Sequence, residues 1–251
     1  MTALELKQKA DRNFIFLNMN MRTFNVKLFL FIITISNCHC SNPTGNSNID
    51  STGLVASFPF DANLRDVSGN NNHGNSGSQA TYAENRSSAA QSSLNFDGVD
   101  DKVVVPRSDT LDLGVGDFTL SAWIKAGTSQ LKYPEIIANR TMVPDGFLFG
   151  LTDGGQLFFQ SGTENREFST SPDLRDNNWH NVVATRSGGL VRYYVDKISV
   201  GEYINTDNIT TPGPYYIGWD IGNPTMTYFN GSLDDVRVYN RSLLLDEIAN
   251  L

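Results

Sequence analysis

The chain has 251 residues, of which 39% are hydrophobic and 18% charged, and it contains 21 glycines and only 2 cysteines. This composition excludes a disordered chain, a collagen-like fibre and a small disulfide-stapled protein, and it fits one large domain or two small ones. Acidic residues outnumber basic ones by 27 to 19, which gives a net charge of -8. Because an acidic chain offers little basic surface to phosphates, we expect neither nucleic acid nor an anionic membrane as a partner.

The first 40 residues follow the order of a secretory signal. Arg22 and Lys27 precede the apolar run 28–35 (LFLFIITI), and small and polar residues come after it. A charged, an apolar and a small-residue region in this order are typical of a signal that is removed from the mature protein. The run is also far shorter than the roughly 20 residues that cross a bilayer. We interpret residues 1–40 as a signal segment, with Met21 as a start that would give it the ordinary length.

This signal predicts a secreted or surface-attached protein without a transmembrane span once the segment is removed. Cleavage after Cys40 would remove both cysteines, so the mature domain would be held together by its core or by a metal ion. The alternative is a lipoprotein that is anchored through Cys38 or Cys40.

Residues 41–53 are polar and rich in turn-forming residues, which indicates a linker, and residues 54–251 read as one domain. Short apolar runs recur in this domain with Gly, Asn, Asp or Pro between them, a pattern typical of antiparallel strands. The expected strands are 54–60, 93–96, 102–105, 118–126, 135–138, 147–151, 156–160, 179–186, 190–195, 215–219 and 232–239. Since only 242–251 (SLLLDEIANL) reads as helical, we predict an all-β fold, a two-sheet antiparallel jelly-roll sandwich with a short C-terminal helix.

Seven motifs occur in this order along the domain: 55–61 (VASFPFD), 66–74 (DVSGNNNHG), 94–101 (LNFDGVDD), 118–124 (FTLSAWI), 179–184 (WHNVVA), 194–196 (YVD) and 231–243 (GSLDDVRVYNRSL). In this order they resemble the laminin-G-like, concanavalin A-like jelly-roll family over residues 54–251. The resemblance implies the fold, but that fold hosts lectins, adhesion modules, glycoside hydrolases and polysaccharide lyases, so the function stays open among them. One departure is Asp196-Lys197, where the family usually has Asp-Gly; it predicts a hairpin turn other than the common two-residue type.

The predicted metal site joins the loop 66–74 to the last strand. If that strand alternates strictly, Asp234 shares a face with Val236 and Val238, and a buried charge there needs a cation. The loop offers carboxylate, amide and carbonyl oxygens, the ligands that Ca²⁺ prefers. The resemblance points the same way, since relatives commonly hold a structural calcium between these two segments. We therefore expect calcium at Asp66 and Asp234, with an amide or carbonyl oxygen from Asn70, Asn72 or His73; the alternative is an Asn/Gly turn beside a salt-bridged aspartate.

No catalytic residue is expected in the domain. Jelly-roll glucanases resemble one another in a Glu-x-Asp-x-Glu run, whose alternate carboxylates point into the same cleft. No such run occurs here, and Glu164 and Glu167 are three positions apart, which would send their side chains to opposite faces of a strand. An enzyme would need carboxylates brought together from separate strands.

Three aromatic residues are candidates for contact with a ligand. Trp219 and Tyr228 lie in the irregular segment 218–230, and Tyr133 lies beside Pro134 in another predicted loop. Aromatic faces in loops suit the apolar side of a sugar ring, although burial at the edge of the sandwich is the alternative. The sequence therefore predicts a secreted or surface lectin-like module that binds carbohydrate or an extracellular protein, with a structural calcium. The alternatives are a polysaccharide-active enzyme, either a glycoside hydrolase or a lyase, and a non-catalytic adhesion or spacer domain.

Overall fold

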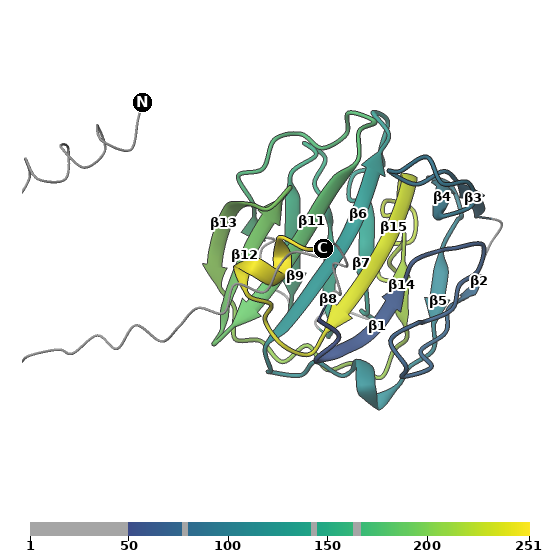
Figure 1. The fold of residues 1–251 in the computed structure, drawn as a ribbon. Helices are drawn as coiled ribbons and strands as arrows, with labels where there is room; N and C mark the ends of the chain where they lie inside the picture. The colour runs from purple at the N-terminus through teal and green to yellow at the C-terminus, as the bar shows by residue number, and fades with distance from the viewer. Residues whose placement is uncertain (1–49, 77–79, 142–144, 163–166) are drawn as a thin grey trace, which may run out of the picture. The chain divides into compact units, whose positions relative to one another are not determined.

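In the computed structural model, residues 50–76, 80–141, 145–162 and 167–251 are described (Figure 1). They belong to a compact unit that spans residues 47–251. The signal segment with Cys38 and Cys40, most of the linker, and Glu164 lie outside the described residues. Within the described ranges, no helix has the length and apolar character that crossing a membrane requires.

One antiparallel sheet, which we call sheet A, has the strand order β13-β12-β11-β6-β15-β4-β3, with β1 paired to β15 (Figure 1). Its strands are β1 (Leu54–Phe58), β3 (Thr81–Ala83), β4 (Ser93–Asp97), β6 (Phe118–Ala126), β11 (His180–Ser187), β12 (Leu190–Val195), β13 (Ile198–Ile204) and β15 (Asn230–Tyr239). The neighbours β11, β6 and β15 are far apart in sequence, so long crossovers as well as hairpins connect the strands of this sheet.

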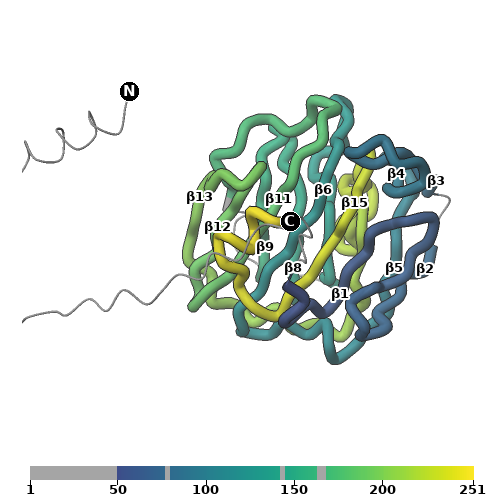
Figure 2. The backbone as a smooth tube through the Cα atoms, viewed as in Figure 1, coloured from purple at the N-terminus to yellow at the C-terminus, as the bar shows by residue number. Residues whose placement is uncertain are grey.

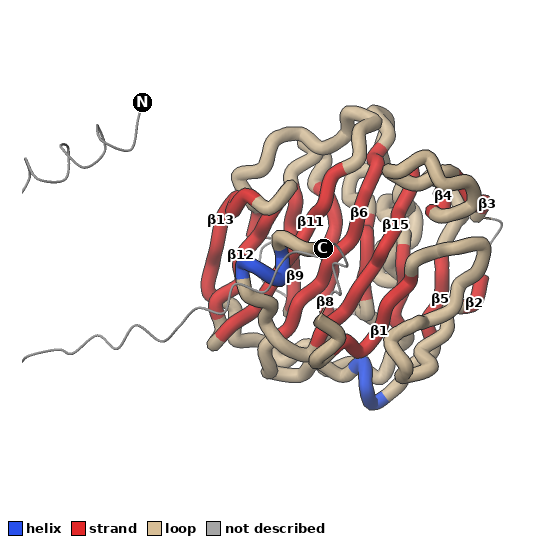
Figure 3. The backbone as a smooth tube through the Cα atoms, in the orientation of Figure 1, coloured by secondary structure: helices blue, strands red, loops and turns tan. Residues whose placement is uncertain are grey.

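The second antiparallel sheet, sheet B, has the order β10-β9-β8-β7-β14-β5-β2. Its strands are β2 (Asn75–Ser76), β5 (Val103–Val105), β7 (Glu135–Ala138), β8 (Phe147–Leu151), β9 (Leu157–Ser161), β10 (Glu167–Phe168) and β14 (Tyr215–Ile217). The helices described are short: the 3-10 turn η2 (Asp109–Leu111) and α2 (Leu245–Ile248), shown in blue in Figure 3. The predicted all-β sandwich with a short C-terminal helix is confirmed.

The core lies between the two sheets. The side chains of β6 that alternate toward it, from Phe118 to Ile124, are fully buried, as the period-two pattern of this strand predicts. Phe118 packs on Phe159 of β9 with ring centroids 5.2 Å apart, and Phe159 stacks on Phe147 of β8 at 5.6 Å. These aromatic contacts join sheet A to sheet B.

The opposite face of sheet A, which we call its outer face, is covered by the C-terminal segment 242–251. This segment, which includes α2, crosses in front of the sheet in Figures 1 and 2. It contributes Leu243, Ile248 and Leu251 to a second cluster of buried apolar residues. At its end the carbonyl of Leu251 accepts a hydrogen bond of 3.1 Å from the indole of Trp123.

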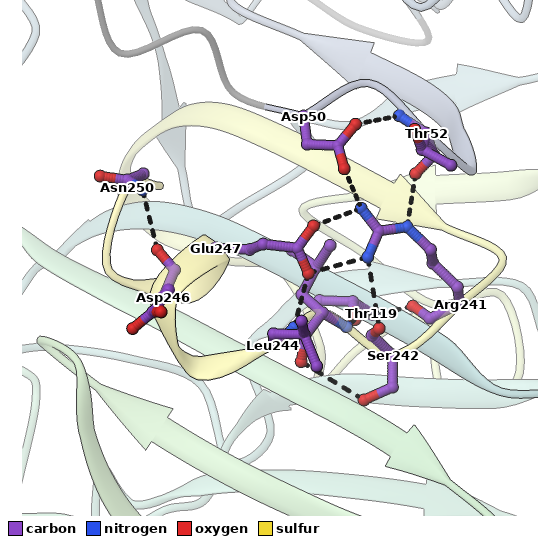
Figure 4. A network of polar contacts seen from close by, with 10 residues as sticks. Asp50, Thr52, Thr119, Arg241, Ser242, Leu244, Asp246, Glu247 and Asn250 are labelled. Carbon is purple, nitrogen blue, oxygen red and sulfur yellow. Dashed lines mark hydrogen bonds and ion pairs between the residues drawn. The ribbon is translucent and has the colours of Figure 1, made fainter. Parts of the chain in front are cut away.

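Arg241 fixes the start of this segment (Figure 4). Its guanidinium donates to the carbonyl of Thr52 at 2.6 Å and pairs with Asp50 at 3.1 Å. The same group binds both carboxylate oxygens of Glu247 in α2, at 2.6 and 2.8 Å. One side chain therefore holds the beginning and the end of the described domain together.

A β-bulge in β15 changes the facing that strict alternation predicts. After the pair of Asp234 with Trp123, the register of β15 against β6 shifts, and Asp235 has a φ of 49°. Asp234 therefore faces outward beside Trp123, whereas Val236 and Val238 are part of the core. The prediction that Asp234 shares a face with these valines was wrong, because a bulge adds one residue to one strand and reverses the alternation beyond it.

The hairpin between β12 and β13 also differs from its prediction. Asp196 and Lys197 connect the strands as a two-residue turn, and both have positive φ, at 48° and 73°. These values are those of a type I′ turn, the common two-residue hairpin. The expectation of another turn type was wrong, because both residues adopt the left-handed conformation that Gly usually supplies. Asp196 is held in place by the backbone N–H of Asn181 at 2.9 Å and by the ring of His180 at 2.7 Å.

Candidate functional site

The carboxylate of Asp66 organises the loop 66–74. The side chain is only 6% exposed. One oxygen accepts from the backbone N–H groups of Ser57 and Ser68 at 2.9 and 2.8 Å, and the other accepts from the Ser68 hydroxyl and from the N–H of Asn72 at 2.8 and 2.9 Å. A carboxylate accepts at about four positions, so donors from the protein already use the acceptor capacity of Asp66.

The other loop residues predicted as metal ligands are also engaged with the protein. The side-chain amide of Asn72 donates to the carbonyl of Val55 at 2.8 Å, and that of Asn70 donates to the same carbonyl at 3.2 Å. The Nδ1 atom of His73 accepts from the backbone N–H of Asp66 at 3.1 Å. These contacts tie the loop to β1 and to itself.

Asp234 lies in a different network, on the outer face of sheet A. It is 2% exposed and pairs with Arg86 at 2.6 Å. Arg86 also pairs with Asp235 at 2.7 Å, and its guanidinium lies over the ring of Trp123, 4.5 Å from the centroid. Burial raises the pKa of Asp234 to about 7, and the neighbouring charge of Asp235 acts in the same direction against the opposing effect of Arg86.

The structure thus gives Asp66 and Asp234 separate sets of partners. Arg86 supplies the positive charge that a buried Asp234 requires, and protein donors fill the acceptor positions of Asp66. The residues named for a shared calcium ion therefore fit such a site poorly. Calcium at Asp66 and Asp234 therefore stays a prediction.

A group of three carboxylates that the sequence reasoning missed lies between β4 and β5. The side-chain oxygens of Asp97, Asp100 and Asp101 lie within 4.8 Å of one another, and Asp101 is buried whereas the other two are exposed. Asp101 accepts from the backbone N–H of Asp97 at 3.0 Å. Several carboxylate oxygens at this separation suit a hard divalent cation. The signal was present in the motif LNFDGVDD, which holds three aspartates within one tight turn.

Trp219 is packed rather than presented to solvent. It is 8% exposed, and Tyr228 stacks on it with ring centroids 5.7 Å apart. Tyr216 meets it edge-on at 5.0 Å, and the ammonium group of Lys102 lies 4.9 Å from its ring centroid. Trp219 therefore supports the half-buried Tyr228 from beneath, which corresponds to the burial that was the alternative for this residue.

The structure brings Tyr133 to the same place. Its backbone N–H donates to the carbonyl of Met226 at 3.0 Å, and the N–H of Asn230 donates to the side chain of Gln130 at 2.9 Å. These bonds join the loop 127–134 to the loop 218–229 and to Asn230, the first residue of β15. In the second loop Ile221 and Met226 are 42% and 39% exposed, so the loop that carries Tyr228 also presents apolar side chains to solvent.

The acidic turn lies next to these two loops. Asp97 pairs with Asn230 in the β4–β15 ladder, and Lys102, which follows the turn, reaches the rings of Trp219 and Tyr228. We call the loops 97–102, 127–134 and 218–229 together the aromatic loop end. It combines a carboxylate cluster with exposed apolar side chains and partly exposed tyrosines at one end of the strands.

A buried ion pair holds the base of this end. Arg140 and Asp220 meet at 2.6 Å, with side chains 7% and 0% exposed. The backbone N–H of Asp220 also donates to the hydroxyl of Thr227 at 3.2 Å, which closes the loop 218–229 on itself. The loop that carries Tyr228 is thus fixed to the residues just after β7.

Two solved structures with a similar fold are described as binding domains. The binding domain of Paraclostridial Mosquitocidal Protein 1 matches with a TM-score of 0.65 and 16% identity, over 78% of this chain and 51% of that one. The binding domain of botulinum neurotoxin DC in complex with rat synaptotagmin II matches with a TM-score of 0.63 and 17% identity, over 80% and 51% of the two chains. This chain therefore spans about half the length of these toxin domains.

A third similar structure is matched over nearly its whole length. Domain 4 of AbnA, an extracellular arabinanase from Geobacillus stearothermophilus, in complex with arabinotriose, has a TM-score of 0.60 and 18% identity, over 80% of this chain and 98% of that one. At these identities the likeness shows the fold alone. Among the curated proteins compared with the chain, none matches.

Residues 97–249 match the family that is described as the concanavalin A-like lectin/glucanases superfamily. The matched residues contain the acidic turn, both tyrosines of the aromatic loop end and the whole of β15. Because the match extends over more than half of the chain, this protein belongs to the concanavalin A-like lectin/glucanase superfamily.

Proposed function

We propose that the domain is a secreted or surface-attached carbohydrate-binding module that contacts its glycan through the aromatic loop end. Membership of the superfamily and similarity to a domain solved with arabinotriose support a binding role. The proposal for secretion rests on the signal-like order of residues 1–40.

The observation that carries the proposal is the hydrogen bond between Tyr133 and Met226, which places the two aromatic loops side by side. Tyr133 and Tyr228 are both partly exposed, and Trp219 stacks beneath the second of them. Sugar rings bind to aromatic faces through their apolar side and to nearby polar groups through their hydroxyls. The carboxylates, amides and Lys102 of the same loops offer such polar groups.

Glycan-array binding of the full chain tests this function. We expect binding to at least one glycan class, and a loss of about tenfold or more in affinity, roughly 1.4 kcal/mol, for Tyr228→Ala and Tyr133→Ala. Phe168→Ala is the matched control, because Phe168 is an exposed aromatic residue of β10, at the other edge of sheet B. Silence on a broad array, or equal binding by both tyrosine variants and the parent, would contradict the proposal.

We further propose that this module binds a structural calcium ion, and that the ion sits at the acidic turn, where three carboxylates lie together. Thermal melting of the full chain with Ca²⁺ and with chelator tests this second part. A site filled at about 100 times its dissociation constant adds roughly 2.7 kcal/mol to the unfolding free energy. We expect Asp100→Asn to lose most of this gain and Asp246→Asn, an exposed carboxylate of α2, to keep it.

A melting temperature that does not respond to chelator, together with elemental analysis that finds no tightly held metal, would refute the calcium site. Glycan binding that persists without calcium would leave the binding function standing, so the two parts of the proposal fail separately.

An extracellular protein is the second candidate partner. The apolar side chains of Ile221 and Met226 on the same loops favour it, since protein interfaces are built around exposed apolar and aromatic residues. This candidate would be favoured if the chain bound no glycan but bound an extracellular protein, and if Met226→Ser lost that binding.

A further inference from the structure

A groove lies on the outer face of sheet A, beside the C-terminal segment. Its volume is about 410 Å³, which is within the range of roughly 300–1,000 Å³ for pockets that bind small molecules. One side is made by Thr185 and Ser187 of β11 and by Arg192 and Tyr194 of β12, and the other side by residues 242–245. None of these residues belongs to the aromatic loop end, so the groove is a separate candidate site.

The floor of the groove is polar. Thr185 of β11 pairs with Arg192 of β12, and Arg192 pairs with Glu202 of β13. Side chains directly opposite each other are about 5 Å apart at Cβ, so these three form one row across the strands. The Nε atom of Arg192 lies 2.9 Å from the carboxylate of Glu202. The floor therefore sets hydroxyl groups beside a charged donor and a charged acceptor.

The wall of the groove is apolar at its rim and fixed in place. Leu244 and Leu245 are 71% and 66% exposed. The N–H of Leu244 donates to the carboxylate of Glu247 at 2.6 Å, and Arg241 holds the same carboxylate (Figure 4). Figure 2 shows this segment in front of β11 and β12. The leucines thus present apolar surface at a position that exists before any ligand arrives.

This combination of surfaces selects the chemical class of the ligand. A hydrocarbon chain would suit the leucines, but it would cover the hydroxyl groups and the ion pair of the floor without replacing their bonds to water, which is costly. A charged ligand would find no excess of opposite charge, because Arg192 is balanced by Glu202 and Arg241 by Glu247. A neutral sugar matches both sides, since its hydroxyls donate and accept and one face of its ring is apolar.

We propose that this groove is a second saccharide site, which binds a neutral sugar residue. Two neighbouring hydroxyls of the sugar lie between Arg192 and Glu202, one accepting from the guanidinium and the other donating to the carboxylate. A guanidinium has five N–H donors, and the pair with Glu202 uses the one at Nε. The hydroxyls of Thr185 and Ser187 bond to the remaining polar edge, and the apolar face of the ring packs on the exposed leucines.

The two sites lie at opposite ends of β6. Thr185 in the groove pairs with Thr119 near the start of this strand, whereas the loop 127–134 follows its end. The inference takes only its class of ligand from the proposed carbohydrate-binding function, and it shares no residue with the aromatic loop end. Each site can therefore be removed by substitution without touching the other.

Titration of the isotope-labelled full chain with glucose, galactose, mannose and arabinose, followed by NMR, tests the groove. We expect at least one of these sugars to shift the amide signals of 185–187, 192–194 and 242–245. Arg192→Ala should weaken this binding by about tenfold or more, because it removes a charge-assisted hydrogen bond. Ser187→Trp should abolish it by filling the groove, since Ser187 is exposed there.

Lys197→Ala is the matched control, because it removes an exposed cation from the neighbouring β12–β13 turn, outside the groove; its affinity should equal that of the parent. Unchanged melting temperatures establish that the groove variants are folded. Signal shifts that are confined to the aromatic loop end, with affinities unaffected by Arg192→Ala and Ser187→Trp, would overturn the groove and leave the proposed function standing. No shift with any of the four sugars would also overturn it, while the glycan array still decides the function of the aromatic loop end.

Discussion

The chemistry of Asp234 depends on a residue that is remote in sequence. Sequence reasoning correctly identified it as a carboxylate that is removed from water and needs a positive charge, and the side chain is indeed buried. The charge is supplied by Arg86, 148 positions away, in the loop between β3 and β4. No spacing rule connects residues so far apart, so the sequence could predict the need for a cation but not which cation meets it.

Asp234 gives the domain a specific pH dependence. Its pKa in the folded state is about 7, against an ordinary value of 3.8. Between these values the folded state holds a proton that the unfolded state has released, so the contribution to stability is present below about pH 4 and is lost as the pH rises through 7. We expect Asp234→Asn to flatten the unfolding free energy between pH 4 and pH 7, as measured by urea titration at several pH values.

The exposed Asp61→Asn is the control for this measurement, since it removes a carboxylate without touching the network of Arg86. An unchanged pH profile in Asp234→Asn would show that this carboxyl does not titrate in the window.

At the scale of strands and turns, the sequence predicted what depends on local pattern. The bounds of β6, β7, β8 and β12 agree with the apolar runs, because these strands bury at least one face and therefore show apolar periodicity. The strand β13 was missed because it is an edge strand with mostly exposed side chains, and its sequence ISVGEYI contains a Gly and a Glu in the middle. Edge strands carry few buried residues and so give a weak signal.

In the candidate site too, the sequence predicted single residues but not which of them lie close together. Tyr133 and Tyr228 could be selected from the sequence because each is an aromatic residue in an irregular segment. Their proximity could not, since it depends on backbone hydrogen bonds between loops about 90 residues apart, such as that from Tyr133 to Met226. The acidic turn was visible in the motif, but whether its carboxylates converge depends on the turn geometry.

The turn between β12 and β13 yields a stability prediction for these elements. Lys197 has a φ of 73° in a type I′ turn, and a left-handed conformation costs a residue with a Cβ roughly 1–2 kcal/mol. Glycine at this position would avoid that cost, but part of the stability gained would be offset by the greater freedom of glycine in the unfolded chain. We expect Lys197→Gly to raise the unfolding free energy by about 0.5–1 kcal/mol, measured in urea.

Lys197→Ala is the control for this change. It removes the same charge and side chain but keeps the strained conformation, so its stability should stay close to that of the parent. Equal gains in both variants would attribute the effect to the lysine side chain rather than to the backbone.

For the whole molecule, Arg241 is the residue that joins the two ends of the described domain (Figure 4). It bonds to Asp50 and Thr52 before β1 and to Glu247 in α2. The hydrogen bond from Arg241 lowers the pKa of Glu247. Hydrogen bonds to charged groups contribute about 1.5–3 kcal/mol each when buried, and less at the partial exposure of this side chain.

We expect Arg241→Ala to lower the unfolding free energy by about 1–3 kcal/mol and to loosen the C-terminal segment first, because α2 has only four residues and relies on this contact. Hydrogen exchange should accordingly increase in 242–251 more than in the core strand β6. Arg192→Ala, at an exposed pair with Glu202, serves as the control with a small effect. Equal exchange in the segment with and without Arg241 would contradict this role.

The bulge at Asp235 constrains chain length in the strand that organises sheet A. β15 is bonded to β1, β4 and β6 together. Deleting one residue there would return the strand to regular alternation, and either the half with its two valines would have to change sides against β1 and β6, or the half that ends at Asp234 would have to change sides against β4 and β6. The side chain at 235 is itself constrained by a φ of 49° and by its pairs with Arg86 and Arg237, and the polypeptide cannot be shortened by one residue at that point without changing the register of β15 against its neighbours.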